Sequence, residues 1–220
     1  MGDIPYFAGM DLTEARIQLF KHLDWEIRDK RVIGAMERVP REKFVLSECY
    51  NAAYDDNPLS IGFGQTISQP FIVAMMLQAL ALQGDEKVLE VGTGSGYVAA
   101  ILAELSRKVI TVECIPELVN SASLLLNNLG YQNIEVHLSD DVLGWINDAP
   151  YDAIIVSAGA PSVPKILFGQ LSWGGRLVIP VGSRFEQRLL KISRNMEGDT
   201  IEDLGACYFV PLLGRDAWEA

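Results

Sequence analysis

The most informative segment of this sequence is Leu89-Glu90-Val91-Gly92-Thr93-Gly94-Ser95-Gly96-Tyr97. It joins a short apolar run at residues 87–91 to a pattern typical of an apolar helix at residues 97–105. Glycines between a strand and a helix let the backbone turn tightly and let a ligand approach it closely. By themselves, these glycines fit tight packing as well as a nucleotide site.

Acidic residues at two further positions favour the nucleotide site. Glu113 follows the next apolar run, residues 109–112, and lies 21 positions beyond Gly92. A carboxylate there can accept hydrogen bonds from both hydroxyls of a ribose, whereas the alternative is a solvated glutamate at a strand end. Asp140 follows the apolar run at residues 134–138, and it either meets the adenine amino group or forms a turn.

The spacing of the glycines distinguishes between cofactors. Dinucleotide sites use G-x-G-x-x-G, whereas Gly92, Gly94 and Gly96 are closer together and follow Glu90. A carboxylate is unfavourable beside an anionic pyrophosphate. It is favourable beside the ammonium group of a methionine moiety, directly or through water. We therefore predict that the chain binds S-adenosylmethionine rather than NAD.

Strand and helix patterns alternate from residue 87 onward, which predicts an α/β fold with a doubly wound, mostly parallel sheet and helices on both faces. Strands are expected at residues 87–91, 109–112, 134–138, 151–156, 176–181, 189–193 and 206–210, and helices at 97–105, 116–129 and 163–171. Earlier helices are expected at residues 12–23, from Asp29 to before Pro40, and at 69–82, with a loop of little regular structure at 51–67.

We expect one domain of residues 1–220. Residues 1–68 would form an N-terminal helical cap with a substrate loop, and residues 69–220 a cofactor-binding α/β core.

The amino-acid composition limits the classes of protein to which the chain can belong. Lys and Arg total 18 against 29 Asp and Glu, so the net charge is −11, which disfavours nucleic acid as a partner. No apolar stretch approaches the roughly 20 residues of a membrane helix, and the N-terminus lacks the pattern of a secretory signal. The three cysteines and two histidines show no metal-ligand spacing. We expect a soluble cytoplasmic protein without metal or membrane association.

One further segment is not a general feature of nucleotide-binding proteins: Ile61-Gly62-Phe63-Gly64-Gln65-Thr66-Ile67-Ser68-Gln69-Pro70. Together with residues 31–45, 89–97, 149–156, 174–182 and 209–212, it resembles the protein-L-isoaspartate O-methyltransferases. The resemblance extends over about residues 29–214.

The resemblance implies a methyltransferase-type fold and a repair activity. S-adenosylmethionine would donate its methyl group to the α-carboxylate of L-isoaspartyl residues in damaged proteins and peptides, leaving S-adenosylhomocysteine. The ester would close to a succinimide, whose hydrolysis returns some normal aspartate. A carboxylate is already an anionic nucleophile at neutral pH, so a site poor in histidine suits this reaction. We expect the enzyme to be a monomer.

Site residues follow from the motifs and the resemblance together. Ser68 is the catalytic candidate, because its hydroxyl would orient the acceptor carboxylate. The alternative is that Ser68 caps the helix expected to start at residue 69. The cofactor contacts that we expect come from Thr66, Ile67, Ser68, Glu90, Gly92, Thr93, Gly94, Gly96, Glu113, Cys114, Asp140 and Asp141.

Departures from the family pattern concern the cofactor. Ser139-Asp140-Asp141 stands where Gly-Asp-Gly is common, and Cys114 where a basic residue is common. We expect both to affect cofactor affinity rather than the type of reaction. The alternatives are a methyltransferase for another acceptor, an NAD-dependent oxidoreductase and a non-catalytic binding protein.

Overall fold

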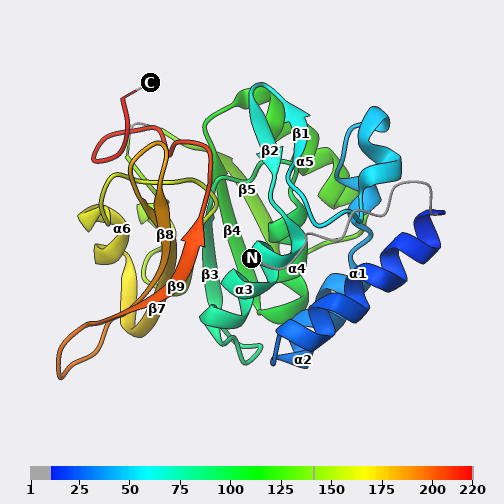
Figure 1. Ribbon diagram of the computed structural model, residues 1–220. Coiled ribbons are helices and arrows are strands. Elements are labelled where there is room, and N and C mark those ends of the chain that lie inside the picture. The colour runs from blue at the N-terminus through cyan, green and yellow to red at the C-terminus, as the bar shows by residue number, and fades with distance from the viewer. Residues whose placement is uncertain (1–10, 141, 220) are drawn as a thin grey trace.

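The computed structural model describes residues 11–140 and 142–219. Its main sheet has seven strands in the order β5-β4-β3-β6-β7-β8-β9 (Figure 1). They are β3 (Lys87–Val91), β4 (Lys108–Glu113), β5 (Ile134–Leu138), β6 (Tyr151–Val156), β7 (Leu171–Gly182), β8 (Gln187–Ser193) and β9 (Thr200–Cys207). The first five strands in this order are parallel, and β8 and β9 are antiparallel to their neighbours. The order reverses between β3 and β6, which confirms a doubly wound sheet.

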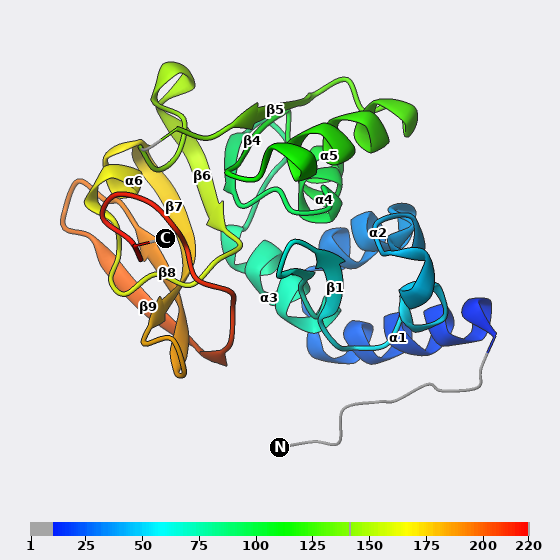
Figure 2. The same cartoon turned by 90° about the horizontal axis from the view of Figure 1, so that it is seen from above.

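Helices cover the two faces of the sheet unequally, as Figure 2 shows. One face carries α3 (Pro70–Leu80), α4 (Tyr97–Leu105) and α5 (Pro116–Asn128), with α1 (Leu12–Glu26) and α2 (Lys30–Arg38) packed outside them. The other face carries the short α6 (Lys165–Gly169), the 3-10 helix η3 (Ile146–Asp148) and loops.

Strand residues alternate between the two cores. Val88 and Ala153 belong to the core under α3–α5, whereas Leu89 and Ile154 belong to the core on the opposite face. Burial on both faces explains why these strands appear in the sequence as continuous apolar runs.

Two N-terminal helices begin on aspartate caps. The Asp11 side chain accepts hydrogen bonds from the backbone N–H groups of Thr13 and Glu14, and Asp29 accepts one from Arg31. Asp29, where the sequence placed the start of this helix, is therefore the N-cap of α2, and α2 ends at Arg38, before Pro40. Such caps satisfy N–H groups that have no partner within the helix.

The prediction of a loop at residues 51–67 was wrong. A 3-10 helix, η2 (Ser47–Ala52), leads to an antiparallel hairpin of β1 (Leu59–Gly62) and β2 (Gln65–Ile67). Phe63 and Gly64 form its two-residue turn, with φ of 54° and 71°. Two central residues of positive φ match the right-handed twist of a hairpin. The strands are too short to give a recognisable alternation in the sequence.

Strand boundaries near the C-terminus also differ from the prediction. β7 begins at Leu171 instead of residue 176, because Gly174 and Gly175 lie within an irregularity of the strand rather than in a turn before it. This shortens α6 to Lys165–Gly169. β9 spans Thr200–Cys207 instead of 206–210, since this mostly exposed edge strand lacks an apolar run. Across the described residues, no helix has both the length and the apolar character that a membrane crossing needs.

Candidate active site

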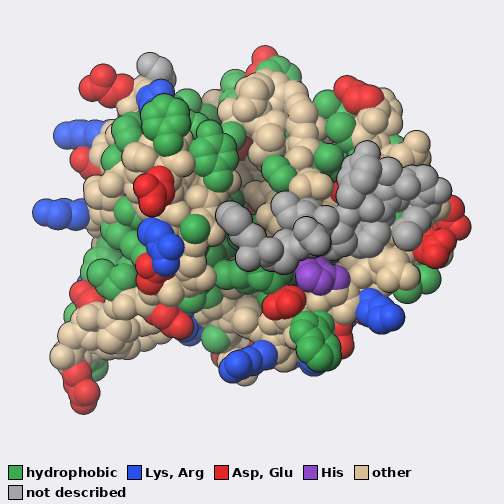
Figure 3. Space-filling view, in the orientation of Figure 1, with side chains coloured by type: hydrophobic (Ala, Val, Ile, Leu, Met, Phe, Trp, Pro, Cys, Tyr) green, Lys and Arg blue, Asp and Glu red, His purple; other side chains and the backbone are tan. Residues whose placement is uncertain are grey.

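A cavity of about 540 Å³ opens beyond the carboxyl ends of β3 and β4, beside the point where the strand order reverses. Ligands of open α/β sheets bind at such a point. The glycine loop and the end of β4 form one wall, and residues 65–68 and 210–214 form the others. In Figure 3, hydrophobic side chains border the hollow between the hairpin and the C-terminal segment.

Most of the predicted cofactor residues line this cavity: Thr66, Ile67, Ser68, Glu90, Gly92, Thr93, Gly94, Glu113, Cys114 and Asp140. Gly96 does not line it. Its φ of 89° starts α4, and a side chain there would meet Leu126 of α5 at 3.2 Å, so Gly96 permits close helix packing. Asp141 lies outside the described residues.

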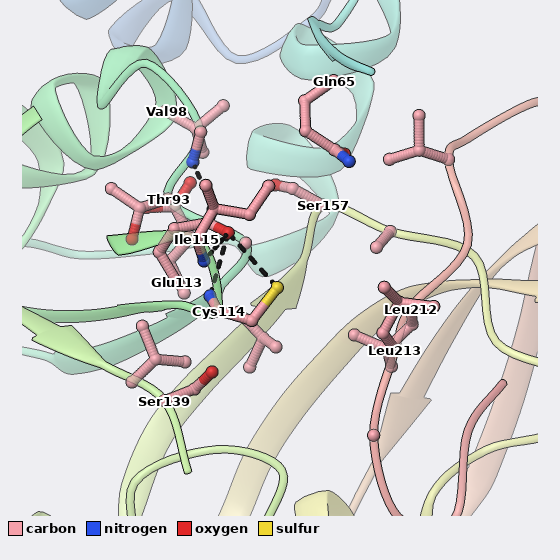
Figure 4. A pocket seen from close by; sticks show the side chains of 18 of the residues that line it. Gln65, Thr93, Val98, Glu113, Cys114, Ile115, Ser139, Ser157, Leu212 and Leu213 are labelled. Atoms are coloured by element: carbon pink, nitrogen blue, oxygen red, sulfur yellow. Dashed lines mark hydrogen bonds between the residues drawn. The ribbon is translucent and has the colours of Figure 1, made fainter. Parts of the chain in front are cut away.

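The Glu113 carboxylate is held in place by the backbone. Oε2 accepts a hydrogen bond from the N–H of Gly94 at 2.9 Å, and Oε1 accepts from the N–H groups of Cys114 at 2.9 Å and Ile115 at 3.1 Å. The Cys114 thiol is a third, weaker partner of Oε1 at 3.5 Å, whereas Oε2 has only the Gly94 N–H among the described residues and can still accept from a ligand hydroxyl. Figure 4 shows Glu113 and Cys114 on one side of the cavity and Leu212 and Leu213 on the other.

Glu90 is fully buried beneath the cavity and lacks one partner. Its Oε2 accepts a 2.6 Å hydrogen bond from the Thr111 hydroxyl, which in turn lies 2.6 Å from the hydroxyl of Thr93. Its Oε1 has no hydrogen-bond partner within residues 11–140 and 142–219. Burial raises the pKa of Glu90 to about 8, although the Thr111 hydroxyl opposes the shift. A cationic ligand group at Oε1 would supply the missing partner and favour the ionised form.

The sequence left open whether Asp140 contacts the adenine amino group or forms a turn. The Oδ1 of Asp140 accepts a 2.8 Å hydrogen bond from the N–H of Val142, so this residue does form a turn. The residue also lines the cavity, and turn formation therefore does not remove it from the binding wall.

Charge is distributed unevenly around the cavity. The ionisable acids among the described lining are Glu90, Glu113 and Asp140, and Lys, Arg and His are absent from that lining. The undescribed residues 1–10, 141 and 220 contain no Lys, Arg or His either. The lining therefore suits a cationic ligand and offers an anionic one no direct cation.

Ser68 lies between β2 and α3 and lines the cavity. The alternative that it caps α3 was wrong, because Gln69 occupies the N-cap position and gives no side-chain cap. Asp56 takes that role from outside the helix, accepting a 2.8 Å hydrogen bond from the N–H of Phe71. Among the described residues, the Ser68 hydroxyl has no hydrogen-bond partner.

Sequence reasoning missed the residues that support Ser68. Arg41 is fully buried and donates from Nη2 to the Ser68 carbonyl at 2.9 Å, and Asp56 is buried beside the start of α3. The only available signal for Arg41 was its place in the family-like segment at residues 31–45, which assigns it no role. Leu212 and Leu213 on the far wall were also missed as site residues.

The sequence model of the family described as Protein-L-isoaspartate(D-aspartate) O-methyltransferase matches residues 16–217. The chain belongs to this family. Protein-L-isoaspartate O-methyltransferase 1 of Syntrophobacter fumaroxidans is 51% identical over 193 residues, covering 88% of this chain and 90% of that protein. Protein-L-isoaspartate O-methyltransferase of Geobacter metallireducens is 48% identical over 209 residues, and the match covers 94% of this chain and 97% of that protein.

Solved structures agree with the family assignment. A protein-L-isoaspartate O-methyltransferase structure aligns with a TM-score of 0.80 and 26% identity, covering 92% of this chain and 67% of its own. A Plasmodium falciparum structure of the same family name, in complex with S-adenosyl-L-homocysteine, aligns with a TM-score of 0.77 and 28% identity, covering 89% of this chain and 96% of its own. The family match confirms the resemblance and disfavours the NAD-dependent oxidoreductase.

Proposed function

We propose that this enzyme transfers the methyl group of S-adenosylmethionine to the α-carboxylate of L-isoaspartyl residues in damaged proteins and peptides. Family membership over residues 16–217 gives the reaction. The observation in the site that carries the proposal is Ser68, which lines the same cavity as Glu90 and Glu113 and whose hydroxyl has no hydrogen-bond partner among the described residues. This geometry brings an acceptor and a cationic donor together.

The residues present fit S-adenosylmethionine. The unpartnered Oε1 of Glu90 is a buried acceptor that an ammonium group would satisfy, directly or through water. The Glu113 carboxylate, fixed by three backbone N–H groups, retains capacity for the ribose hydroxyls. Asp140 lines the cavity where the adenine amino group would lie, next to the exposed end of β5.

The chain's own residues orient the reactants rather than move protons. When bound, S-adenosylmethionine supplies an electrophilic methyl group on a sulfonium, whose C–S bond breaks as the O–C bond forms, leaving a neutral thioether. The acceptor carboxylate is ionised at neutral pH and requires no general base. Ser68 donates a hydrogen bond to one carboxylate oxygen, and the other is then directed toward the donor. Orientation of this kind can supply most of the acceleration.

Two parts of the chain divide the work in this proposal. Residues 1–68 supply the acceptor side through the hairpin and Ser68, with cofactor contacts at Thr66, Ile67 and Ser68, and residues 69–220 supply the rest of the cofactor side. We further propose that the enzyme works as a cytoplasmic monomer without nucleic acid or membrane. The net charge of −11 supports the exclusion of nucleic acid. Light scattering on the purified protein tests the monomer.

Radiolabelled methyl transfer to paired peptides tests the reaction. The two peptides share one sequence and differ only in an L-isoaspartyl or a normal aspartyl residue. We expect label in the isoaspartyl peptide alone, released by mild base as expected for a methyl ester. Equal labelling of both peptides, or labelling of neither, would refute the proposed substrate.

A further inference from the structure

Ser68 is held through its backbone by a buried arginine. The Arg41 side chain is fully buried, and its guanidinium donates from Nε to the Ala53 carbonyl at 2.8 Å and from Nη2 to the Ser68 carbonyl at 2.9 Å. These carbonyls lie 15 positions apart in the sequence. One guanidinium therefore joins the chain before the β1–β2 hairpin to the residue directly after it.

Arg41 is buried without a direct salt bridge to any described residue, although the nearby Asp56 carboxylate favours its charged form and so opposes the lowering of the Arg41 pKa by burial. None of the salt bridges among the described residues includes Arg41, its Nη1 has no hydrogen-bond partner, and its guanidinium lies 4.9 Å from the centre of the Tyr97 ring. Burial of a charged side chain is costly unless its geometry is specifically used. The planar fork of arginine can meet two carbonyls in fixed directions, which a lysine ammonium on a flexible stem does not do.

Asp56 holds the residues that directly follow Ser68. Its Oδ1 accepts a 2.8 Å hydrogen bond from the N–H of Phe71, and its Oδ2 accepts one of 2.8 Å from the side-chain amide of Gln69. The first N–H groups of a helix need partners from outside it, and a serine before the helix commonly supplies one. Since Asp56 supplies that partner here, the Ser68 hydroxyl is released from capping.

We propose that Arg41 and Asp56, which together we call the clamp, are positioning residues for methyl transfer: they fix the backbone at and directly after Ser68 and leave its hydroxyl for the acceptor carboxylate. This inference rests on the proposed function of Ser68. A displacement of about 1 Å at a reacting centre can lower the rate about 100-fold. The hydrogen bonds that hold Glu90 and Glu113 involve neither residue of the clamp, so we expect the clamp to affect the acceptor side rather than the cofactor wall.

Arg41→Lys tests the clamp, because it keeps the positive charge and removes the fork. We expect kcat/KM for the isoaspartyl peptide to fall about 10- to 100-fold, while Kd for S-adenosylhomocysteine changes less than about twofold. Arg176→Lys is the matched control. Arg176 donates to the Leu80 carbonyl at 2.7 Å, at the opposite end of α3, and does not line the cavity. We expect the control variant to keep kcat/KM within about twofold of the wild type.

A double-mutant cycle separates positioning from general structural damage. In a Ser68→Ala background, Arg41→Lys should change kcat/KM less than about threefold, since the hydroxyl that it positions is gone. Asp56→Asn keeps an acceptor for the Phe71 N–H but removes the one for the Gln69 amide. Its effect on kcat/KM should depend on Ser68 in the same way. This variant replaces Arg41→Lys in the cycle if Arg41→Lys does not fold.

Several outcomes would overturn the clamp. The first is additivity of the Arg41→Lys and Ser68→Ala effects on kcat/KM, and the second is an equal loss of kcat/KM in the Arg176→Lys control. The third is a loss of affinity for S-adenosylhomocysteine as large as the loss of kcat/KM. The fourth is loss of the fold in both Arg41→Lys and Asp56→Asn. A wild-type enzyme that fails to methylate isoaspartyl peptides refutes the proposed function instead.

Discussion

The two walls of the cavity serve ligands of opposite charge. The wall built from the ends of β3 and β4 carries carboxyl groups that suit a cationic donor, with Glu90 buried and Glu113 fixed by backbone N–H groups. The wall built from β2 and Ser68 presents neutral groups, although its substrate is an anion. Its cation, Arg41, lies behind Ser68 and contacts the backbone instead of the cavity. The difference implies that the bound donor, rather than a protein side chain, provides the positive charge facing the acceptor.

The largest effect is expected when the acidic wall loses its fixed carboxylate. Glu113→Ala should raise Kd for S-adenosylmethionine roughly 10- to 150-fold, because hydrogen bonds to a charged group contribute about 1.5–3 kcal/mol. Calorimetric titration measures the change. Glu117→Ala removes the same charge from the exposed first turn of α5, away from the cavity, and should leave Kd unchanged. Wild-type affinity in Glu113→Ala would make Glu113 a structural residue only.

Removing the hydroxyl from the neutral wall should impair the reaction and spare the cofactor. We expect Ser68→Ala to lower kcat/KM for the isoaspartyl peptide by at least about tenfold, as loss of a hydrogen bond to a charged acceptor predicts. Since Ser68 does not cap α3, the melting temperature should not fall by the 2–4 °C or so that loss of a cap brings at this size. Ser60→Ala, on the exposed part of the hairpin, is the control. Normal turnover in Ser68→Ala would remove the proposed acceptor contact.

The charge of the donor should control binding of the acceptor. Two unit charges about 4 Å apart interact by about 4 kcal/mol at an effective dielectric constant of 20. We expect the isoaspartyl peptide to bind roughly tenfold or more tightly to the enzyme loaded with sinefungin, which carries an amine in place of the sulfonium methyl, than to the S-adenosylhomocysteine complex. Fluorescence anisotropy of a labelled peptide measures both affinities. Equal affinities would mean that a protein cation serves the acceptor after all.

The smallest effect concerns the proton on Glu90. Its pKa is raised from an ordinary 4.5 to about 8 in the fold, so between these values the folded protein holds a proton that the unfolded chain has lost. The free energy of unfolding should therefore decrease as pH rises through this window. A ligand ammonium favours ionised Glu90, so affinity for S-adenosylhomocysteine should rise roughly fivefold from pH 7 to pH 8.

Glu90→Gln provides the control for this pH effect. The variant cannot ionise at this position, so both pH dependences should flatten between pH 5 and about 8. Calorimetry in two buffers of different ionisation enthalpy should detect proton release on binding to the wild type at pH 7 and not to the variant. An unchanged pH profile in Glu90→Gln would assign the dependence to another group.

The acidic wall could be predicted from the sequence because its signals are local. Apolar runs buried on both faces mark β3 and β4, and Glu90, Gly92 and Glu113 follow from their positions relative to these strands. The neutral wall gave misleading local signals. Ser68 before Gln69-Pro70 is a normal capping pattern, yet the cap comes from Asp56, which the chain supplies 15 positions before Phe71.

The burial of Arg41 could not be predicted from the sequence either. The residue stands in the charged sequence Arg41-Glu42-Lys43, which is typical of a solvated surface. Only the packing of η2, the start of α3 and Tyr97 around it places its guanidinium inside the protein. β9 was misplaced for the opposite reason, because an exposed edge strand needs no continuous apolar run.

Because Arg41 joins the Ala53 carbonyl to that of Ser68, the chain is anchored on both sides of the hairpin. The second strand of the hairpin lines the cavity, but the two-residue turn at Phe63 and Gly64 does not, so this turn can be lengthened or replaced at small entropic cost. Surface loops commonly select partners while a rigid scaffold holds the chemistry. For protein engineering, libraries restricted to this turn would vary which polypeptides are admitted, while the point of methyl delivery stays in register with the donor.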